Sequence, residues 1–294
     1  MNIKAEIKER MEEVDRHLDR LLPKETEYPD IIFKAMRYSV FAGGKRLRPI
    51  LVLETCKMLG GDVEEAMDYA CALEMIHTYS LIHDDLPALD NDNFRRGRLT
   101  NHRAFGENIA ILAGDALLSH AFEVMANAAV KKNSLRGMKA MQAIAHGAGV
   151  FGMVAGQVVD VINDGKKVDE ATLDFIHKKK TAAMIEGAFL AGAHLGGADE
   201  GALEILQSAA EKIGLAFQIQ DDILDVTGTM EELGKPIHSD ERNEKNTYVS
   251  LYGIEASEAA VQRLSDEAVA LLEQFGARSA FLVALTNTLI KRRK

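Results

Sequence analysis

Two short aspartate clusters, each at the end of an apolar helical segment, constrain what this chain can fold into. The first lies in LIHDDLPALDND and the second in QIQDDILD, and their acidic members are Asp84, Asp85 and Asp90, and Asp221, Asp222 and Asp225. Two carboxylates ~4 Å apart repel by roughly 4 kcal/mol at the effective dielectric of a protein surface. Each cluster therefore favours a bound cation, and carboxylate oxygens suit Mg²⁺. One such cluster could equally be a solvated loop, but the second copy predicts two walls of one metal site.

The residues after the first cluster carry the opposite charge. Pro87 lacks a backbone donor and ends or kinks the helix, so the chain can turn and bring Asp90 back beside Asp84. Arg95 and Arg96 follow in RRG at residues 95–97. Their planar guanidinium groups suit phosphate, so this stretch predicts an anion next to the metal.

A further group of cations lies in GGKRLRP at residues 43–49. The glycine pair can expose its backbone amides, and Lys45, Arg46 and Arg48 follow it at the start of the next helix. Amides at a helix start, together with cations, can hold an anion. By itself this stretch is as compatible with a solvated loop as with an anion site.

Apolar periodicity indicates helices throughout the chain and no convincing strand. We expect helices over about 1–22, 28–42, 51–59, 63–85, 107–130, 135–162, 170–197, 200–226, 255–275 and 279–290. The chain has 294 residues, 47% of them hydrophobic, and only five prolines, which suits one large helical core. Cys56 and Cys71 lie inside apolar patterns, so we expect buried free thiols. The predicted fold is all-α, with a single domain over residues 1–294.

Net charge and the N-terminal segment limit the partners of this chain. A formal charge of -10 argues against non-specific binding to nucleic acid. The first 22 residues are charged and amphipathic and lack the apolar centre of a signal peptide, so we expect a cytoplasmic protein. Residues 140–159 are uncharged over about the length of a membrane span, yet they include Gln142, His146 and Gln157. We interpret them as part of a core helix and expect no stable membrane insertion.

Two magnesium-binding clusters near arginines and lysines describe a site for diphosphate. The sequence contains neither a Walker loop nor a nucleophile paired with a base. We therefore interpret the diphosphate as a leaving group on a hydrocarbon that the long apolar helices hold. Residues 228–247 form a polar stretch directly after the second cluster and are expected to act as a lid over phosphate. Of Lys178, Lys179 and Lys180, at most one side chain can point inward.

These motifs resemble, in order and spacing, those of the trans-prenyltransferase (polyprenyl synthase) family over essentially the whole chain. The matching stretches are GGKRLRP (43–49), EMIHTYSLIHDDLPALDND (74–92), RRG (95–97), AGD (113–115), GQVVD (156–160), KT (180–181) and FQIQDDILD (217–225). Within the family the chain is most similar to bacterial farnesyl diphosphate synthases. The resemblance implies a helix bundle around a deep apolar cavity, usually as a homodimer.

The resemblance also implies an activity and a role for individual residues. The implied reaction is Mg²⁺-dependent condensation of isopentenyl diphosphate with an allylic diphosphate, either dimethylallyl or geranyl, to farnesyl diphosphate; the alternative product is geranylgeranyl diphosphate. The metal ligands would be Asp84, Asp85, Asp90, Asp221, Asp222 and Asp225. Contacts to the allylic diphosphate would come from Arg95, Lys180, Thr181, Gln218, Lys235 and Lys245, and contacts to isopentenyl diphosphate from Gly44, Lys45, Arg48, His77 and Arg96. Catalysis itself would rest on Asp84, Asp85, Asp221, Asp222, Lys180 and Lys235.

Product length is expected to depend on Tyr79, which lies five residues before Asp84 and therefore ~7.5 Å further along the helix. An aromatic residue here accompanies fifteen-carbon products in the family that the sequence resembles. The alternative is that Tyr79 only packs in the core. The chain departs from the family pattern at His238, where glycine is usual, and at Asn93, which replaces an acidic residue.

Three other functions can be compared with this one. In a carboxylate-bridged di-metal bundle, Glu74 with His77 and Asp174 with His177 would be the ligands, but that function explains neither aspartate cluster. A terpene cyclase shares the aspartate-rich pocket but does not need GGKRLRP. A catalytically silent partner protein would have lost an aspartate or an arginine from these motifs, and none is lost.

Overall fold

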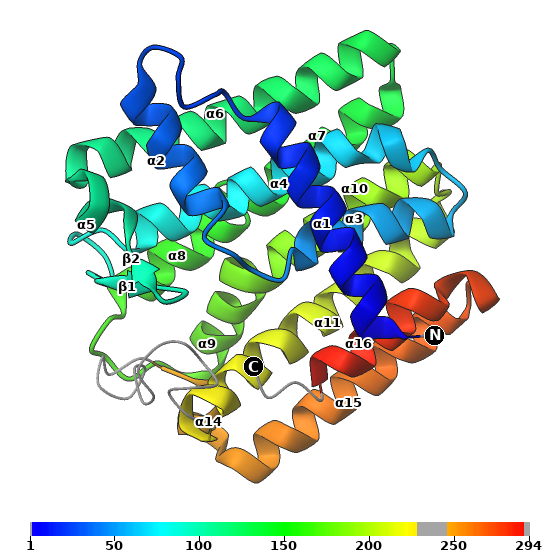
Figure 1. Ribbon diagram of the computed structural model, residues 1–294. Coiled ribbons are helices and arrows are strands. Elements are labelled where there is room, and N and C mark those ends of the chain that lie inside the picture. The colour runs from blue at the N-terminus through cyan, green and yellow to red at the C-terminus, as the bar shows by residue number, and fades with distance from the viewer. Residues whose placement is uncertain (1, 228–245, 291–294) are drawn as a thin grey trace.

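The computed structural model describes residues 2–227 and 246–290, the latter without the side chain of Ile290. The first helices are α1 (Ile3–Leu21), α2 (Asp30–Val40), α3 (Leu47–Met58), α4 (Val63–Asp84), α5 (Asn101–Phe105) and α6 (Glu107–Lys132). Then come α7 (Leu135–Ala148), α8 (Met153–Ile162), α9 (Glu170–Ile176), the π-helix η1 (His177–Ala182), α10 (Ala183–Gly196) and α11 (Glu200–Thr227). The C-terminal helices are α14 (Tyr248–Tyr252), α15 (Ile254–Glu273), the 3₁₀-helix η2 (Gly276–Ser279) and α16 (Ala280–Ile290). The predicted all-α class is confirmed (Figure 1).

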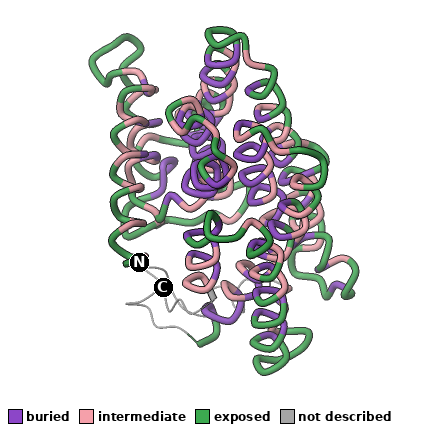
Figure 2. The backbone as a smooth tube through the Cα atoms, turned by 90° about the vertical axis from the view of Figure 1, so that its right-hand side faces the viewer, coloured by how far each residue is buried: buried purple, intermediate pink, exposed green. Residues whose placement is uncertain are grey.

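Helix α4 lies at the centre of this bundle and delivers the first aspartate cluster. It begins where the side chain of Asp62 accepts a hydrogen bond from the Glu64 amide at 3.0 Å, an N-cap that satisfies an otherwise unpaired donor. It packs against α3, α6 and α10, and buried residues run along most of its length. Buried segments lie inside the bundle, and exposed residues lie on its outer faces and loops (Figure 2). One hydrophobic cluster joins residues from Val14 in α1 to Leu285 in α16. Cys56 and Cys71 are buried free thiols in this core, as predicted.

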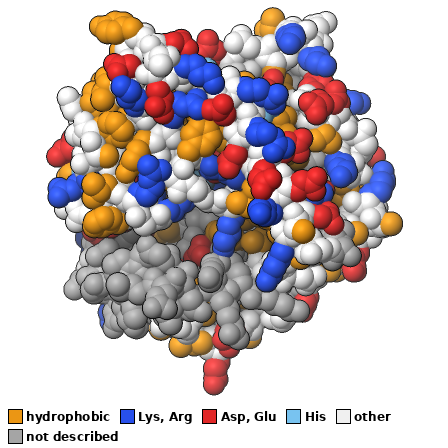
Figure 3. Space-filling view, viewed as in Figure 1, with side chains coloured by type: hydrophobic (Ala, Val, Ile, Leu, Met, Phe, Trp, Pro, Cys, Tyr) orange, Lys and Arg blue, Asp and Glu red, His pale blue; other side chains and the backbone are white. Residues whose placement is uncertain are grey.

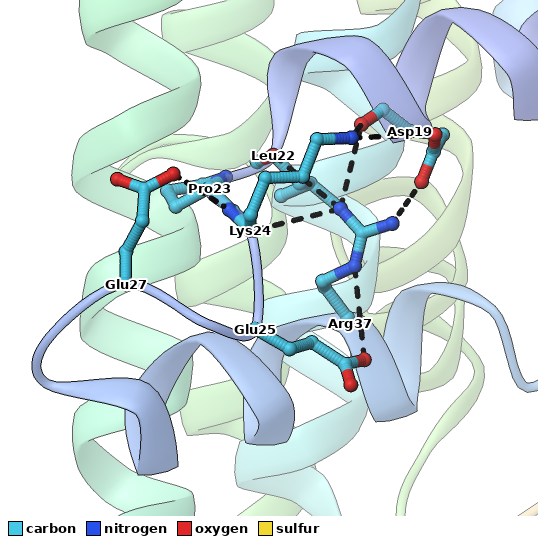
Figure 4. Close-up of polar contacts among 7 residues, drawn as sticks. All are labelled: Asp19, Leu22, Pro23, Lys24, Glu25, Glu27 and Arg37. Carbon is cyan, nitrogen blue, oxygen red and sulfur yellow. Dashed lines mark hydrogen bonds and ion pairs between the residues drawn. The ribbon is translucent and has the colours of Figure 1, made fainter.

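Polar contacts centred on Arg37, with further contacts of Lys24, hold the connection between α1 and α2 (Figure 4). Arg37 of α2 donates hydrogen bonds to the carbonyl oxygens of Asp19, Leu22 and Pro23 and pairs with the carboxylate of Asp19. Carbonyls at a helix end have no partner within the helix, so Arg37 completes the C-terminus of α1. On the surface around α1 and α2, charged side chains of both signs are interspersed (Figure 3).

The predicted single helix over residues 135–162 is wrong. The structure divides it into α7 and α8 at residues 149–152. A Cβ atom on Gly152 would lie 2.2 Å from the carbonyl oxygen of Gly147, so only glycine allows this tight turn. The division turns α8 away from α7, and η1 then packs against α8.

The expectation of no strands is also corrected, at one place. Strands β1 (Phe94–Arg95) and β2 (Arg98–Leu99) form a two-residue antiparallel hairpin in which Arg95 pairs with Arg98. The turn residues Arg96 and Gly97 have φ values of 53° and 76°, as a type I′ turn requires. This hairpin aims the two predicted phosphate-binding arginines in different directions.

Much apolar surface of α6, α7 and α8 stays outside the core. By length and composition alone, the segments Glu107–Lys132 and Leu135–Ile162 are apolar enough to cross a membrane. Only 39% and 33% of their apolar windows are buried within the chain, and the second segment is interrupted between α7 and α8.

Candidate active site

A cavity of about 490 Å³ lies between α3, α4, α8 and η1. Its polar lining includes Arg48, His77, Asp84, Lys180 and Thr181, all predicted as site residues. Its apolar lining comes mainly from α4 and α8 and includes Tyr79 and Val158. A larger depression of about 760 Å³ near α1 and α2 is lined by none of the predicted site residues. The 490 Å³ cavity is therefore the candidate site, with a charged part suited to diphosphate and an apolar part suited to hydrocarbon.

The first aspartate cluster folds back on itself as the sequence predicts. Asp84 is the last residue of α4, and the amide of Asp90 donates to the Asp84 carbonyl oxygen at 2.9 Å. The turn after Pro87 thus brings Asp90 beside Asp84. The side-chain amide of Gln157 in α8 donates to Asp84 Oδ1. Gln157 was not predicted as a site residue, although its position in GQVVD was a signal that could have indicated it.

Asp85 points into the protein and is 3% exposed. Arg95 Nε lies 2.8 Å and 2.9 Å from the two Asp85 carboxylate oxygens, and Arg95 Nη2 lies 2.7 Å from Oδ1. Burial raises the pKa of Asp85, and the Arg95 guanidinium acts in the opposite direction. Asp85 therefore fixes the orientation of Arg95, and the predicted metal-binding role of Asp85 stays a prediction.

The GGKRLRP stretch meets Arg96 of the hairpin, which lies 53 residues after Gly43 in the chain. Arg96 donates to the carbonyl oxygen of Gly43. A Cβ atom on Gly44, whose φ is 125°, would lie 2.6 Å from Arg96 Nη1. Only glycine permits this approach, which brings Arg96 against the backbone where isopentenyl diphosphate was predicted to bind. Lys45 is exposed next to it.

Burial acts on two further residues that line the cavity, His77 and Arg48. Burial lowers the pKa of His77 well below its ordinary value, and Arg48 and Arg96 lower it further, so His77 is neutral at pH 7. Burial also lowers the pKa of Arg48, although Glu74 and Asp221 raise it. Among the residues that the structure describes, none accepts a hydrogen bond from Arg48 Nε. A buried donor of this kind needs an acceptor, which a phosphate oxygen would supply.

The second cluster belongs to a hydrogen-bonded chain between η1, α11 and α14. Thr181 Oγ1 donates to Gln218 Oε1 at 2.7 Å, and Gln218 Nε2 donates to Asp222 Oδ1 at 3.0 Å. The other Asp222 oxygen accepts from the Tyr248 amide at 2.7 Å. His177 Nε2 lies 3.5 Å from that oxygen. Asp222 and Asp225 are both buried, whereas Asp221 acts on Arg48 electrostatically.

Of the three consecutive lysines, one points towards the cavity. Lys180 lines the cavity and pairs with Asp160 at 2.7 Å, while Lys178 pairs with Asp174 and Glu211 on another face. The prediction of at most one inward lysine therefore agrees with these contacts. Asp160 was a second residue that the predicted site lacked. Lys235, His238 and Lys245 lie outside the described residues.

The carboxylates fit Mg²⁺ better than a di-metal centre. Within the described part of the chain, no three His, Cys, Asp or Glu side chains converge closely enough to hold a metal ion. Mg²⁺ commonly takes one or two carboxylates and completes its shell with water and substrate phosphate, which Asp84, Asp90 and Asp221 could provide. Both carboxylates of the di-metal alternative already have cationic partners, because Glu74 binds Arg46 at 3.0 Å and Asp174 pairs with Lys178 at 3.1 Å.

Curated relatives match nearly the whole chain. A protein named dimethylallyltranstransferase from Fischerella ambigua is 46% identical over 292 residues, covering 99% of this chain and 84% of that protein. Geranylgeranyl diphosphate synthase from Cyanophora paradoxa is 44% identical, and the match covers 99% of this chain and 97% of that protein. Farnesyl diphosphate synthase from Geobacillus stearothermophilus is 45% identical, with 86% of each chain covered.

Solved structures agree in fold over nearly the whole chain. A protein described as an FPP/GFPP synthase from Zymomonas mobilis has a TM-score of 0.88 at 35% identity, covering 98% of this chain and 99% of that one. A geranyltransferase from Helicobacter pylori, complexed with magnesium and isoprenyl diphosphate, has a TM-score of 0.88 at 33% identity with 99% of each chain covered. The polyprenyl synthetase family model matches residues 29–275. The chain therefore belongs to the polyprenyl synthetase family and is a transferase of prenyl groups.

Proposed function

We propose that this protein condenses isopentenyl diphosphate with dimethylallyl and geranyl diphosphate, with Mg²⁺, and stops at fifteen-carbon farnesyl diphosphate. The observation that carries the product length is the place of Tyr79 in the cavity wall. Tyr79 is 9% exposed and lines the same cavity as Asp84. It lies five residues before Asp84 on α4, a distance of ~7.5 Å along the helix.

The Tyr79 ring is held in place by its neighbours. It packs edge-on against the His83 ring, with 5.7 Å between ring centroids, and His83 Nε2 lies 3.1 Å from the Ile111 carbonyl oxygen in α6. A hydrocarbon whose diphosphate is fixed beside Asp84 would meet this ring as it grows. A rigid aromatic ring at that depth supports a short product, and geranylgeranyl diphosphate is the alternative.

The charged part of the cavity would bind and polarise the allylic diphosphate. Asp84, Asp90 and Asp221 would hold Mg²⁺, which when bound neutralises charge on the departing diphosphate. Lys180 and Thr181 would orient that diphosphate from η1. The bond between the allylic carbon and the diphosphate oxygen breaks, and its electron pair leaves with the diphosphate. Preorganised cations stabilise the charge that develops there.

On the other side, isopentenyl diphosphate would bind Lys45, Arg48, His77 and Arg96. Its double bond then attacks the allylic cation, and a proton leaves the new carbon skeleton. The released diphosphate oxygen accepts that proton, so the chain needs no dedicated base. The apolar part of the cavity excludes water, which would otherwise trap the cation.

The proposed enzyme acts as a homodimer through the exposed apolar faces of α6, α7 and α8. Leu112 of α6, Leu135 of α7 and Ile162 of α8 are 54%, 68% and 58% exposed. Monomeric soluble proteins rarely leave large contiguous apolar patches in water, which supports a second copy as the cover for these faces.

The direct test is turnover with labelled isopentenyl diphosphate, each allylic diphosphate and Mg²⁺, followed by chromatography of the products. We expect farnesyl diphosphate as the end product from both dimethylallyl and geranyl diphosphate. Chelation should stop turnover, and added Mg²⁺ should restore it. A twenty-carbon end product would establish the alternative instead.

Replacing Tyr79 separates the two interpretations of this residue. Tyr79→Ala removes the ring, so twenty-carbon or longer products should form from the same substrates. Tyr79→Phe keeps the ring and removes only the hydroxyl, and should still yield farnesyl diphosphate. If Tyr79 only packs in the core, Tyr79→Ala would cost about 3–5 kcal/mol of stability while the product remained fifteen carbons long.

A further inference from the structure

A buried arginine that the proposed reaction does not use lies behind the isopentenyl diphosphate side of the cavity. Arg46 is 2% exposed, and its guanidinium contacts three different helices. Nε lies 2.7 Å from Asp15 Oδ1 in α1, and Nη1 lies 3.0 Å from Glu74 Oε1 in α4. Nη2 donates to the carbonyl oxygen of Val40, the last residue of α2, at 2.7 Å. All three nitrogen atoms of the planar guanidinium therefore donate a hydrogen bond.

The backbone of Arg46 is in a conformation that residues other than glycine seldom adopt. Its φ and ψ are 48° and 35°, directly before α3 begins at Leu47. L-residues disfavour this left-handed region, so the anchored side chain stabilises a turn that the backbone would otherwise avoid. Lys45 precedes this turn and Arg48 follows it, so the orientation of both depends on it.

Arg46 is also the ion-pair partner of Glu74, which is 2% exposed. Burial acts to lower the pKa of Arg46, Arg48 and Arg96, and the Glu74 carboxylate acts to raise it in each case, so it lies within electrostatic range of all three. Glu74 forms its side-chain hydrogen bond and ion pair with Arg46. No described residue accepts from Arg48 Nε. If Arg46 lost its charge, the buried carboxylate would need another cation, because an unpaired buried charge is strongly unfavourable.

We propose that Arg46 is a positioning residue that holds Glu74 away from Arg48, leaving the Arg48 guanidinium for the diphosphate of isopentenyl diphosphate. This inference rests on the proposed function. Without Arg46, Glu74 would turn to Arg48 and neutralise it. The cavity would then lose affinity for one substrate and keep its affinity for the other.

Three variants test this role: Arg46→Met, Glu74→Gln and the double variant. Arg46→Met keeps the length of the side chain and removes its charge. We expect KM for isopentenyl diphosphate to rise roughly 10- to 100-fold, the size of effect that a misplaced binding group produces. KM for geranyl diphosphate should change by less than about twofold, well below a misplacement effect. Titration calorimetry of isopentenyl diphosphate alone should show the same loss of affinity.

The double variant distinguishes two possible roles of Arg46. In one, Arg46 pairs with Glu74 and so keeps that carboxylate from Arg48; in the other, Arg46 is a structural clamp that only joins α1, α2 and α4. With a neutral amide in place of the Glu74 carboxylate, nothing competes for Arg48, so adding Glu74→Gln to Arg46→Met should restore most of the lost affinity. This non-additivity is what a double-mutant cycle measures. A structural clamp predicts no rescue, since the double variant would lose the same contacts. Should Arg46→Met fail to fold, Arg46→Lys retains the charge and should raise KM by a smaller factor.

Arg10 offers a matched control. It joins α1 to α3 through an ion pair with Glu54 at 2.6 Å and lies over the Phe281 ring at 4.0 Å. Arg10→Met should lower the melting temperature and leave KM for isopentenyl diphosphate unchanged.

Two outcomes would overturn the inference: equal KM increases for both substrates, or no rescue in the double variant. In either case, normal turnover by the wild type would still support the proposed function. Absence of wild-type turnover would reject the proposed function itself.

Discussion

Single residues around the cavity owe their charge states to helices that are distant in the chain. Burial raises the pKa of Asp85 and lowers that of His77, so in both cases the protein interior favours the neutral form. For Asp85 the guanidinium of Arg95 opposes this effect. For His77 the neighbouring arginines add to it. The pKa of each side chain therefore depends on its burial and on the charged partners that the fold places next to it.

His177 makes this effect measurable as pH-dependent stability. Burial lowers its pKa from 6.5 to about 4, although Asp174 and Asp160 act in the opposite direction. Below pH 6.5 the unfolded chain binds a proton that the folded chain does not bind until about pH 4, so the free energy of unfolding falls over that window. The loss should reach about 2 kcal/mol near pH ~5. Urea unfolding at several pH values should show a smaller decrease for His177→Gln, and the exposed His146→Gln should behave like wild type.

At the scale of elements, the contact between α8 and η1 places the residues that face the diphosphate. A Cβ atom on Gly156 would lie 2.1 Å from the Lys180 amide nitrogen, so the two backbones touch. This approach lets Lys180 pair with Asp160 across the two elements at 2.7 Å. A π-helical turn often occurs at a functional site. Here Lys178 and Lys180 of η1 face different sides: Lys180 lines the cavity, and Lys178 pairs with Asp174 and Glu211.

Gly156→Ala should therefore damage both stability and turnover. The added methyl group meets backbone atoms that cannot move independently, which should cost about 1–3 kcal/mol and shift η1. Thermal melting and kcat with geranyl diphosphate measure the two effects. Gly201→Ala is the control, because its nearest neighbour lies 3.7 Å away at the start of α11. If Gly156→Ala melts and reacts like Gly201→Ala, the α8–η1 contact does not position Lys180.

At the scale of the whole molecule, the core and the apolar surface have different roles. Helices α4 and α10 are buried along most of their length. Helix α6 is less so, with only 39% of its apolar window buried. Burying apolar area is worth roughly 25 cal/mol per Å², so the proposed homodimer would gain stability by covering these exposed faces.

Light scattering should accordingly give the mass of a dimer for the wild type. Leu112→Lys places a charge on the exposed apolar face of α6 and should shift the protein towards monomer. Ile254→Lys, at a residue that is 38% exposed at the start of α15, should stay dimeric. Monomeric wild type would contradict the proposed interface, as would a dimer that Leu112→Lys leaves intact.

Local patterns in the sequence were sufficient for the helical class and for the position of both aspartate clusters. The turn that returns Asp90 to Asp84 follows from Pro87 and its neighbours, because a proline acts on the few residues around it. Buried free Cys56 and Cys71 follow from apolar periodicity alone. Helix ends and helix faces depend on residues within about one or two turns of each other, and such residues lie only a few positions apart in the sequence.

The partners within the site depend on contacts that no local pattern contains. Gln157 reaches Asp84 across 73 residues, and Arg96 reaches Gly43 across 53. Periodicity could not reveal the division of residues 135–162 either, because the backbone contacts that require glycine exist only in the folded chain. Which lysine faces the cavity, and which carboxylate Arg46 neutralises, are likewise decided only when separate helices pack. Such choices arise from burial, where an unpaired charge is costly and each partner must come from whichever helix lies next to it.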